Sequence, residues 1–357
     1  MKKILTIILV LLLLFFVSLS YKLLCLILLA ITWKQQIKKQ FTYRHGYKVL
    51  IMILCAFWVI VQPNYFYHSY NRVQLIYQDN KGKPILPPVS HYLINVLLPE
   101  EEIMNLGVWV ARLGATFIPY VHGGTLLKQF QNDDNTGKIG NFYRPYNKLN
   151  RSFNFLMSGT ISQAFNTIGL PKTQSVYVVK PKNYDKNRKY PVVFFCHGGL
   201  GNWKLYQGLW RDLEDYIVVS VGTQDMTGIY HYNDIKAIFT KQLPFLEKLG
   251  YKVDKSQVHI MGLSNGGTAV NIAYNKFNKR FKSITFISTG IHQTYPIKSK
   301  VLMIGGGKDS SSSSLPLAAK VFKKRGSPYS LYWDNKETHY ILVNQTDDII
   351  SFLKKNL

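Results

Sequence analysis

The sequence contains only three cysteines in 357 residues, too few for a disulfide framework. Charged residues are also scarce, at 18% of the chain, while hydrophobic residues reach 47%. This composition excludes an intrinsically disordered chain, because disorder requires low hydrophobicity and a high density of charge. The length favours two domains of roughly 150 residues each.

Acidic residues are absent from the first 78 positions, and eight of the 44 lysines and arginines fall before residue 62. The whole chain carries a formal charge of +25, which indicates an anionic neighbour such as a nucleic acid or a membrane surface. No nucleic-acid-binding module is recognisable in the sequence. We therefore expect no nucleic-acid partner and assign the charge to contact with a membrane.

Two apolar runs near the N-terminus predict a membrane anchor over residues 1–67. Residues 4–33 are almost entirely apolar, and a transmembrane helix needs about 20 such residues. Residues 47–66 form a second run that ends in aromatic residues typical of a membrane interface. These runs predict a multi-pass protein with transmembrane segments at about 4–33 and 47–66. The alternative is a cleaved signal peptide with Ser18-Leu19-Ser20 at the cleavage site.

The linker Lys34–Lys48 suggests how the anchor is oriented. It carries five lysines and arginines, and such linkers stay in the cytoplasm by the positive-inside rule. The second span would then place the rest of the chain outside the cytoplasm. Lys2 and Lys3 favour the opposite orientation if residues 4–33 cross once, so the number of spans in that run stays open.

Residues 68–170 give few signals and are predicted to be a partly helical connecting region. Acidic residues after Pro99 favour the start of a helix. Ile103–Val121 is apolar enough for an amphipathic helix or a third span. The tripeptide His122-Gly123-Gly124 follows no clear buried strand, so it is interpreted as a loop.

From residue 171 to residue 357 the pattern alternates between short apolar runs and helical spacing. It predicts an α/β fold, a mostly parallel sheet with helices on both faces. The carboxyl ends of parallel strands share one edge of a sheet, and sites form there. The predicted strands are 175–179, 191–196, 217–221, 258–261, 284–288, 301–304 and 330–333, and the helices are 232–249, 268–279, 315–324 and 347–355.

The segment Gly262-Leu263-Ser264-Asn265-Gly266 lies between a predicted strand and a predicted helix. It matches the G-x-S-x-G pattern, in which a sharp turn presents a nucleophilic serine. Gly262 and Gly266 permit the close backbone approach that such a turn needs. Ser264 is therefore the candidate nucleophile, with a simple helix N-cap as the alternative.

A second motif, His197-Gly198-Gly199, directly follows the predicted strand 191–196. Acyl transfer needs two N–H donors near the developing oxyanion. We expect these donors to be the backbone N–H groups of Gly199 and Asn265, with that of Leu200 as an alternative. A plain glycine turn is the competing interpretation.

A serine nucleophile also needs a base and an acid that orients the base. His339 lies after the last predicted strand and Asp309 after the preceding strand, which gives the order serine, aspartate, histidine. Asp334 and Glu337 remain competing acids. Of the other histidines, His259 falls within a strand and is expected to be a core residue, and His231 and His292 fit less well.

The motifs together resemble the α/β-hydrolase superfamily, in its minimal serine esterase, prolyl-oligopeptidase-like and dienelactone-hydrolase-like branch. The resemblance is carried by residues 176–199 and 253–266, with the later aspartate and histidine in order. It implies an α/β-hydrolase fold, here preceded by transmembrane helices, and a triad of Ser264, Asp309 and His339. It implies no cofactor, and no cluster of residues has metal-ligand spacing.

The sequence therefore predicts a membrane-anchored serine hydrolase that cleaves a carboxylic ester, thioester or amide of a small-molecule or lipid substrate. The short connection between residues 289 and 301 leaves no room for a lid, which favours a bulky or membrane-presented substrate. One alternative is an acyltransferase that uses the same triad on an envelope or lipid acceptor. The other is a non-catalytic membrane-bound protein that keeps the fold for binding.

Overall fold

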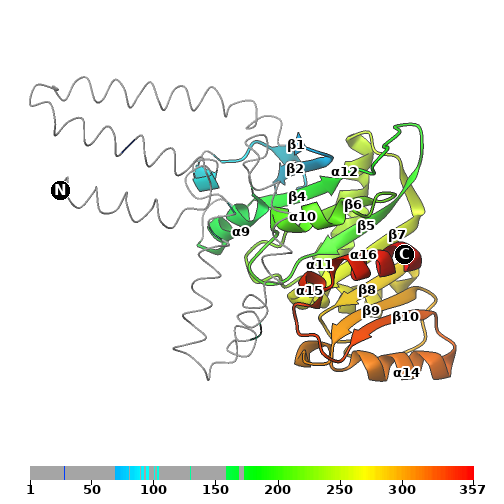
Figure 1. Cartoon of the computed structure of the whole chain (residues 1–357). Helices are drawn as coiled ribbons and strands as arrows, with labels where there is room; N and C mark the ends of the chain where they lie inside the picture. Colours follow the sequence, from blue (N-terminus) through cyan, green and yellow to red (C-terminus); the bar gives the residue numbers. More distant parts are fainter. Residues whose placement is uncertain are drawn as a thin grey trace, which may run out of the picture.

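A computed structural model of the chain describes residues 69–79, 81–88, 158–168 and 173–357, together with the single residues Leu28, Ser90, His91, Ile94, Asn95, Glu100, Ile103 and Gln129 (Figure 1). Apart from Leu28, the predicted spans at 4–33 and 47–66 lie outside this part of the chain, as does the tripeptide His122-Gly123-Gly124. So does the predicted helix Ile103–Val121, apart from its first residue. Within the described part, no helix is long and apolar enough to cross a membrane.

The centre of the domain is a ten-stranded sheet in the order β1-β2-β4-β6-β5-β7-β8-β9-β10, with β3 paired to β2 (Figure 1). From β6 to β10 all neighbours are parallel, whereas β4 is antiparallel to both β2 and β6. Strands β1 and β3 are each antiparallel to β2. The order from β2 to β10, with β4 reversed, is that of the α/β-hydrolase fold. The strands are β1 Ser69–Tyr70, β2 Val73–Gln78, β3 Pro84–Ile85, β4 Gln174–Val179, β5 Tyr190–Cys196, β6 Ile217–Val221, β7 Val253–Leu263, β8 Ser283–Ile287, β9 Lys300–Gly306 and β10 Tyr329–Asp334.

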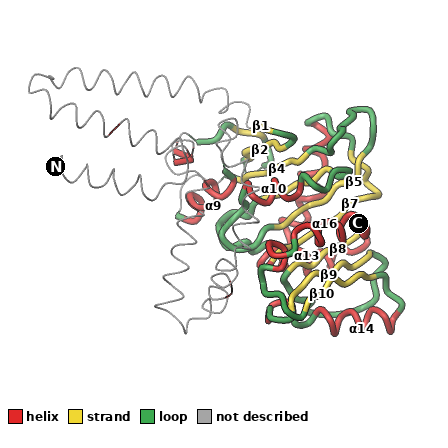
Figure 2. The backbone as a smooth tube through the Cα atoms, viewed as in Figure 1, coloured by secondary structure: helices red, strands yellow, loops and turns green. Residues whose placement is uncertain are grey.

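Helices cover both faces of the sheet (Figure 2). One apolar core cluster joins the sheet to α11, α12, α13 and α14, and a second joins its other face to α10, α15 and α16. Because both faces are covered, the central strands are near-continuous runs of Val, Ile and Phe rather than alternating patterns. The helices are α9 Gly159–Thr167, α10 Lys204–Trp210, α11 Tyr232–Ala237, α12 Leu243–Lys248, α13 Gly267–Lys276, α14 Leu315–Arg325, α15 Ile341–Asn344 and α16 Thr346–Asn356.

The sheet begins earlier in the chain than the boundary at residue 171 predicts. Strand β2 pairs along its whole length with β4, from Val73 opposite Val179 to Gln78 opposite Gln174. Helix α9 also packs on the domain, with Ile161 buried. Part of the predicted connecting region therefore belongs to the same domain as the sheet.

The predicted helix over 232–249 is confirmed, but its middle is wound differently. A π-helical segment, Ile238–Gln242, joins α11 to α12, and the helix ends before Gly250, whose φ is +86°. A positive φ suits a glycine that terminates a helix. Helices α9, α10 and α15 were not predicted, because each is short or lacks a long apolar stripe.

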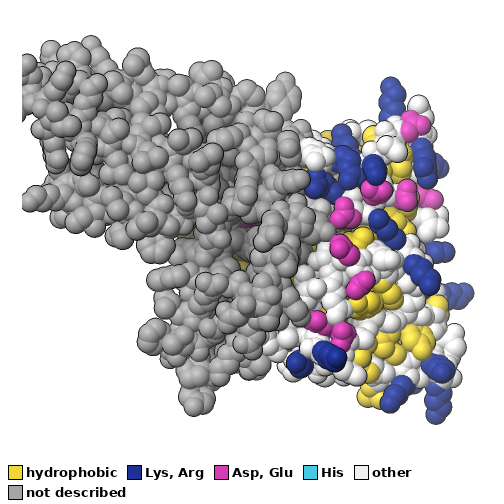
Figure 3. Space-filling view, in the orientation of Figure 1, with side chains coloured by type: hydrophobic (Ala, Val, Ile, Leu, Met, Phe, Trp, Pro, Cys, Tyr) yellow, Lys and Arg dark blue, Asp and Glu magenta, His cyan; other side chains and the backbone are white. Residues whose placement is uncertain are grey.

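The charged surface is mixed on the face shown in Figure 3. Lysine and arginine side chains there lie among aspartates and glutamates and do not form one continuous basic stripe. Two exposed ion pairs, Lys182–Glu214 at 2.9 Å and Lys255–Glu247 at 2.8 Å, are part of this pattern. Exposed pairs of this kind contribute little to stability.

Candidate active site

Ser264 lies at the sharp turn between strand β7 and helix α13. Its φ is +52°, in the left-handed region that is costly for a residue with a side chain. A Cβ added to Gly262 would lie 2.3 Å from the carbonyl oxygen of Gly266, so the turn needs glycine there. The elbow predicted from the sequence is therefore formed, and it holds the Ser264 hydroxyl at the carboxyl edge of the sheet.

His339 is beside this hydroxyl. Its Nε2 lies 2.9 Å from Ser264 Oγ, at hydrogen-bond distance. The loop after β10 that carries His339 is held by Ser288, whose hydroxyl donates to the His339 carbonyl oxygen at 2.8 Å. Ser288 directly follows β8, so the end of one strand fixes the loop that follows another.

Asp309, on the loop after β9, is the carboxylate beside the His339 ring. Its Oδ1 lies 3.1 Å from His339 Nδ1 and accepts a hydrogen bond from the Ser311 N–H at 3.0 Å. Burial raises the pKa of Asp309, but His339 and the Ser311 N–H outweigh burial and hold this pKa below its ordinary value. The carboxylate is therefore ionised at neutral pH. Nδ1 still lacks a fully aligned acceptor, and such bonds commonly align only when substrate binds.

The two competing acids are engaged elsewhere. Glu337 accepts hydrogen bonds from Asn344 at 2.7 Å and from Gln345 at 3.1 Å. Asp334 accepts a hydrogen bond from Gln345 at 2.8 Å. These contacts tie the loop after β10 to α15, so both carboxylates shape the loop that carries His339.

Three further histidines have other places in the fold. His259 is buried in β7, where its Nδ1 lies 2.7 Å from Ser283 Oγ and burial lowers its pKa to about 4. His231 is the N-cap residue of α11, and the His292 N–H donates to Asn271. The core position expected for His259 is confirmed.

The glycine motif after β5 lies directly against Ser264. A Cβ on Gly198 would lie 3.1 Å from Ser264 Cβ, and a Cβ on Gly199 would lie 3.4 Å from Asn265 Nδ2. Gly199 and Asn265 therefore flank Ser264 from two different loops. The N–H of Leu200 donates to the Met226 carbonyl oxygen at 2.7 Å, so it is not available as the alternative oxyanion donor.

His197 is fully buried and supports the glycine loop. Its Nε2 faces the Gln163 amide nitrogen at 2.8 Å and the Thr223 N–H at 3.2 Å, both of which are donors. Nε2 must therefore accept, which places the ring proton on Nδ1, 2.6 Å from the Gly198 carbonyl oxygen. Burial lowers the pKa of His197 to about 4, so the ring is neutral and fixes the loop.

Two glutamines at the site carry no sequence signal. Gln163, on α9, contacts His197 as described and also accepts a hydrogen bond from the Asn202 N–H at 2.6 Å. Gln129 accepts a hydrogen bond from the His339 N–H at 3.3 Å and donates to the Lys308 carbonyl oxygen at 2.8 Å. Gln129 therefore joins the loops that carry Asp309 and His339. A lone amide side chain matches no motif, so only geometry reveals these roles.

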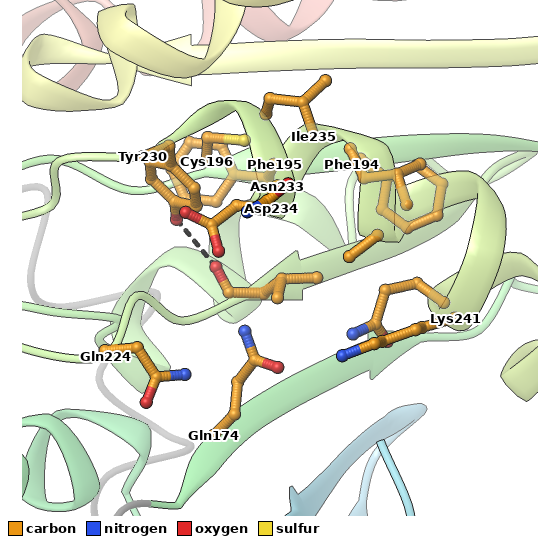
Figure 4. A pocket seen from close by; sticks show the side chains of 14 residues that line it. Gln174, Phe194, Phe195, Cys196, Gln224, Tyr230, Asn233, Asp234, Ile235 and Lys241 are labelled. Atoms are coloured by element: carbon orange, nitrogen blue, oxygen red, sulfur yellow. Dashed lines mark hydrogen bonds between the residues drawn. The ribbon is translucent and has the colours of Figure 1, made fainter. Parts of the chain in front are cut away.

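A separate pocket lies between the sheet and α11 (Figure 4). None of the triad residues lines it. Tyr230 borders the pocket, donates to the Val221 carbonyl oxygen at 2.7 Å and accepts from the His197 N–H at 3.1 Å. The pocket therefore lies between β5, the strand that precedes the glycine loop, and α11, and it does not lead to Ser264. Within the described residues, no group of His, Cys, Asp and Glu could hold a metal ion.

Substituting Gly266 tests the packing of the elbow. A Cβ there would lie 2.2 Å from the Cys196 carbonyl oxygen, a backbone atom that cannot move aside cheaply. We expect Gly266→Ala to lower the free energy of unfolding by about 3 kcal/mol in denaturant titrations. Gly326→Ala is the control, because a Cβ there meets nothing within 4 Å and costs only the strain of φ +65°, about 1 kcal/mol. Equal losses of unfolding free energy in the two variants would contradict the close packing of Gly266 against the Cys196 carbonyl oxygen.

Comparisons with known proteins find several hydrolases but no matching family model. The chain is 30% identical to probable dipeptidyl-peptidase 5 of Aspergillus clavatus in an alignment of 132 residues, which covers 30% of this chain. An acylaminoacyl peptidase of Pyrococcus horikoshii has a TM-score of 0.40 and 16% identity, over 52% of this chain and 40% of that one. A CE1 ferulic acid esterase of Anaeromyces mucronatus has a TM-score of 0.39 and 15% identity, over 52% of this chain and 85% of that one.

The chain covers only 17% of the A. clavatus protein, so an activity of that whole protein is not transferred by the match.

Proposed function

We propose that this protein is a serine hydrolase that cleaves a carboxylic ester through an acyl-enzyme. The observation that carries the proposal is the contact chain at the sheet edge. Ser264 Oγ lies 2.9 Å from His339 Nε2, and His339 Nδ1 lies 3.1 Å from Asp309 Oδ1. These distances support the proposal, because acyl transfer by serine needs a nucleophile next to a base and a base next to an orienting acid.

In the proposed reaction, Ser264 Oγ attacks the substrate carbonyl carbon while His339 Nε2 takes the hydroxyl proton. The carbonyl oxygen becomes an oxyanion, stabilised by the N–H groups of Gly199 and Asn265. The charged His339 is stabilised by ionised Asp309 and returns its proton to the leaving alcohol. A water molecule, deprotonated by His339, then attacks the acyl-enzyme, and His339 returns this proton to Ser264 Oγ as the bond to the acyl group breaks and the acid is released.

The same triad could pass the acyl group to an alcohol instead of water, and one observation favours this second candidate. Only twelve residues connect the end of β8 to the start of β9, so no lid domain is inserted there. A site without an inserted lid at this connection suits a bulky acceptor as well as a bulky substrate.

We also propose that the N-terminal apolar runs anchor the domain at a membrane, with the catalytic domain outside the cytoplasm. An intact triad disfavours a purely binding role.

A substrate panel tests the proposal and separates the candidates. Purified full-length protein is assayed on acyl esters, acyl thioesters and peptide amides, with and without added acceptor alcohols. We expect ester hydrolysis to be the fastest reaction and water to be the main acceptor. Transfer to the alcohol in preference to water would favour the acyltransferase, whereas preferential cleavage of peptide amides would identify a peptidase. Failure to turn over any of these substrates would contradict the proposed function.

A further inference from the structure

Three exposed hydrophobic side chains lie on the segments around the glycine loop. Ile168 is 71% exposed, Leu200 67% and Ile229 44%. They come from the end of α9, the loop after β5 and the loop after β6. Large hydrophobic side chains gathered at an exposed place indicate a binding surface more often than isolated ones do.

Two hydrogen bonds of the Met226 backbone and one close backbone approach at Gly228 hold these three segments together. The Met226 N–H donates to Thr167 Oγ1 at 3.2 Å, next to Ile168. The Met226 carbonyl oxygen accepts from the Leu200 N–H at 2.7 Å. Ile229 follows Gly228, where a Cβ would lie 2.2 Å from the Gly198 carbonyl oxygen. The apolar side chains therefore lie on loops with fixed backbone positions.

The same loops reach the nucleophile. Leu200 follows Gly198 and Gly199, and Gly198 packs against Ser264. From the other side, Asn265 Nδ2 donates to the Thr227 carbonyl oxygen at 2.8 Å, two residues before Ile229. The carboxylate of Asp225 in this loop is already bonded to the Thr227 N–H at 2.9 Å and to its hydroxyl. Leu200 and Ile229 thus expose apolar side chains on the two loops beside Ser264, and the nearby Asp225 carboxylate is already bonded within its own loop.

The backbone of Leu200 gives an independent reason to assign a role to its side chain. Its φ is +72°, a conformation that glycine and asparagine adopt easily and that leucine adopts only with strain. Its side chain is mostly exposed, so no burial in the core offsets that strain. Residues strained in this way are held by the surrounding structure and cluster at active sites and ligand-binding loops.

We propose that Ile168, Leu200 and Ile229 form an apolar rim that binds the hydrocarbon part of the substrate's acyl group. This inference rests on the proposed serine hydrolase function and narrows its substrate class to esters of hydrophobic acids. A chain laid along the rim removes apolar surface from water on both partners, which is favourable in proportion to the area buried. Charged or strongly polar acyl groups gain nothing there.

Leu200→Asn tests the rim, with Leu317→Asn as the matched control. Asparagine tolerates the positive φ, so we expect Leu200→Asn to unfold thermally at the wild-type temperature or above it. Leu317 is equally exposed, at 66%, but lies on α14, away from the glycine loop. The measurement is kcat/KM for p-nitrophenyl octanoate and p-nitrophenyl acetate, with full-length protein and with the octanoate below its aggregation concentration.

We expect the wild type and Leu317→Asn to favour octanoate over acetate. In Leu200→Asn the octanoate-to-acetate ratio of kcat/KM should fall roughly 10-fold, mainly through the KM for octanoate. Three results would contradict the proposal that the rim binds the acyl chain. They are an unchanged octanoate-to-acetate ratio in Leu200→Asn, an equal loss of kcat/KM for both esters, and a wild type without preference for octanoate. If Leu200→Asn instead weakened only binding to lipid vesicles, the rim would be a membrane contact. Failure of the wild type on both esters, with no fluorophosphonate label on Ser264, would overturn the proposed function itself.

Discussion

Ser264→Ala is expected to lower kcat for ester hydrolysis by about 10⁴-fold or more. The variant removes the only atom in the triad that can form the acyl-enzyme, while the N–H donors and the substrate-binding surface stay in place. The small rate that remains would come from those groups acting on bound water. The measurement is the steady-state rate of the wild type's best ester substrate, at equal concentrations of folded protein.

Ser313→Ala provides the control for this substitution. Ser313 is exposed, and its hydroxyl donates only to the Ser310 carbonyl oxygen in the turn after Asp309. We expect its rate to stay within about twofold of wild type. Residual activity above a tenth of wild type in Ser264→Ala, with an unchanged thermal unfolding curve, would show that another residue is the nucleophile.

Asp309→Asn is expected to lower kcat by about 10⁴-fold, because an amide cannot stabilise the charged His339 and favours the wrong ring tautomer. The Asp309 carboxylate lies 3.1 Å from His339 Nδ1, and its pKa is held below the ordinary value. The measurement compares kcat with KM. Because the substitution acts on the reaction rather than on binding, KM should change much less than kcat.

Asp334→Asn and Glu337→Gln are the controls for the choice of acid. Both carboxylates bond to Gln345 in the described structure, so we expect less than about tenfold loss in either variant, arising from the shape of the loop. A larger loss in one of them than in Asp309→Asn would identify that residue as the acid that orients His339.

The lowered pKa of Asp309 also links the site to stability. A carboxyl group whose pKa is lower in the folded state stabilises the fold above its ordinary pKa near 3.8. That contribution is lost as the pH falls from this value through the folded-state pKa. Asp309→Asn should therefore flatten the fall in stability below about pH 4, as followed by denaturant unfolding.

The meeting of Ser264, Asp309 and His339 at one sheet edge could be predicted because each follows a recognisable strand. Ser264 lies in a five-residue pattern whose glycines are required by backbone contacts, and Asp309 and His339 follow β9 and β10. A parallel sheet brings those strand ends to one edge, so residues 75 positions apart in sequence meet at 2.9 Å. The local sequence pattern and the sheet topology together were enough to predict where these three residues lie.

The parts that could not be predicted depend on contacts between distant segments. Strand β2 pairs with β4 about a hundred residues later, and nothing in its six residues marks that partner. Gln129 and Gln163 act through single amide groups, which have no motif. The choice between Leu200 and Gly199 as oxyanion donor depended on one hydrogen bond to Met226, which only the folded loops show.

The most direct test of the account is the site at which a fluorophosphonate reacts. This probe forms a covalent bond with a serine oxygen only when a neighbouring base activates it. Intact-mass analysis and peptide mapping of the folded full-length protein should show one adduct, on Ser264, which is lost in His339→Ala and in denatured protein. No adduct, or an adduct on another serine, would contradict a Ser264–His339–Asp309 catalytic centre.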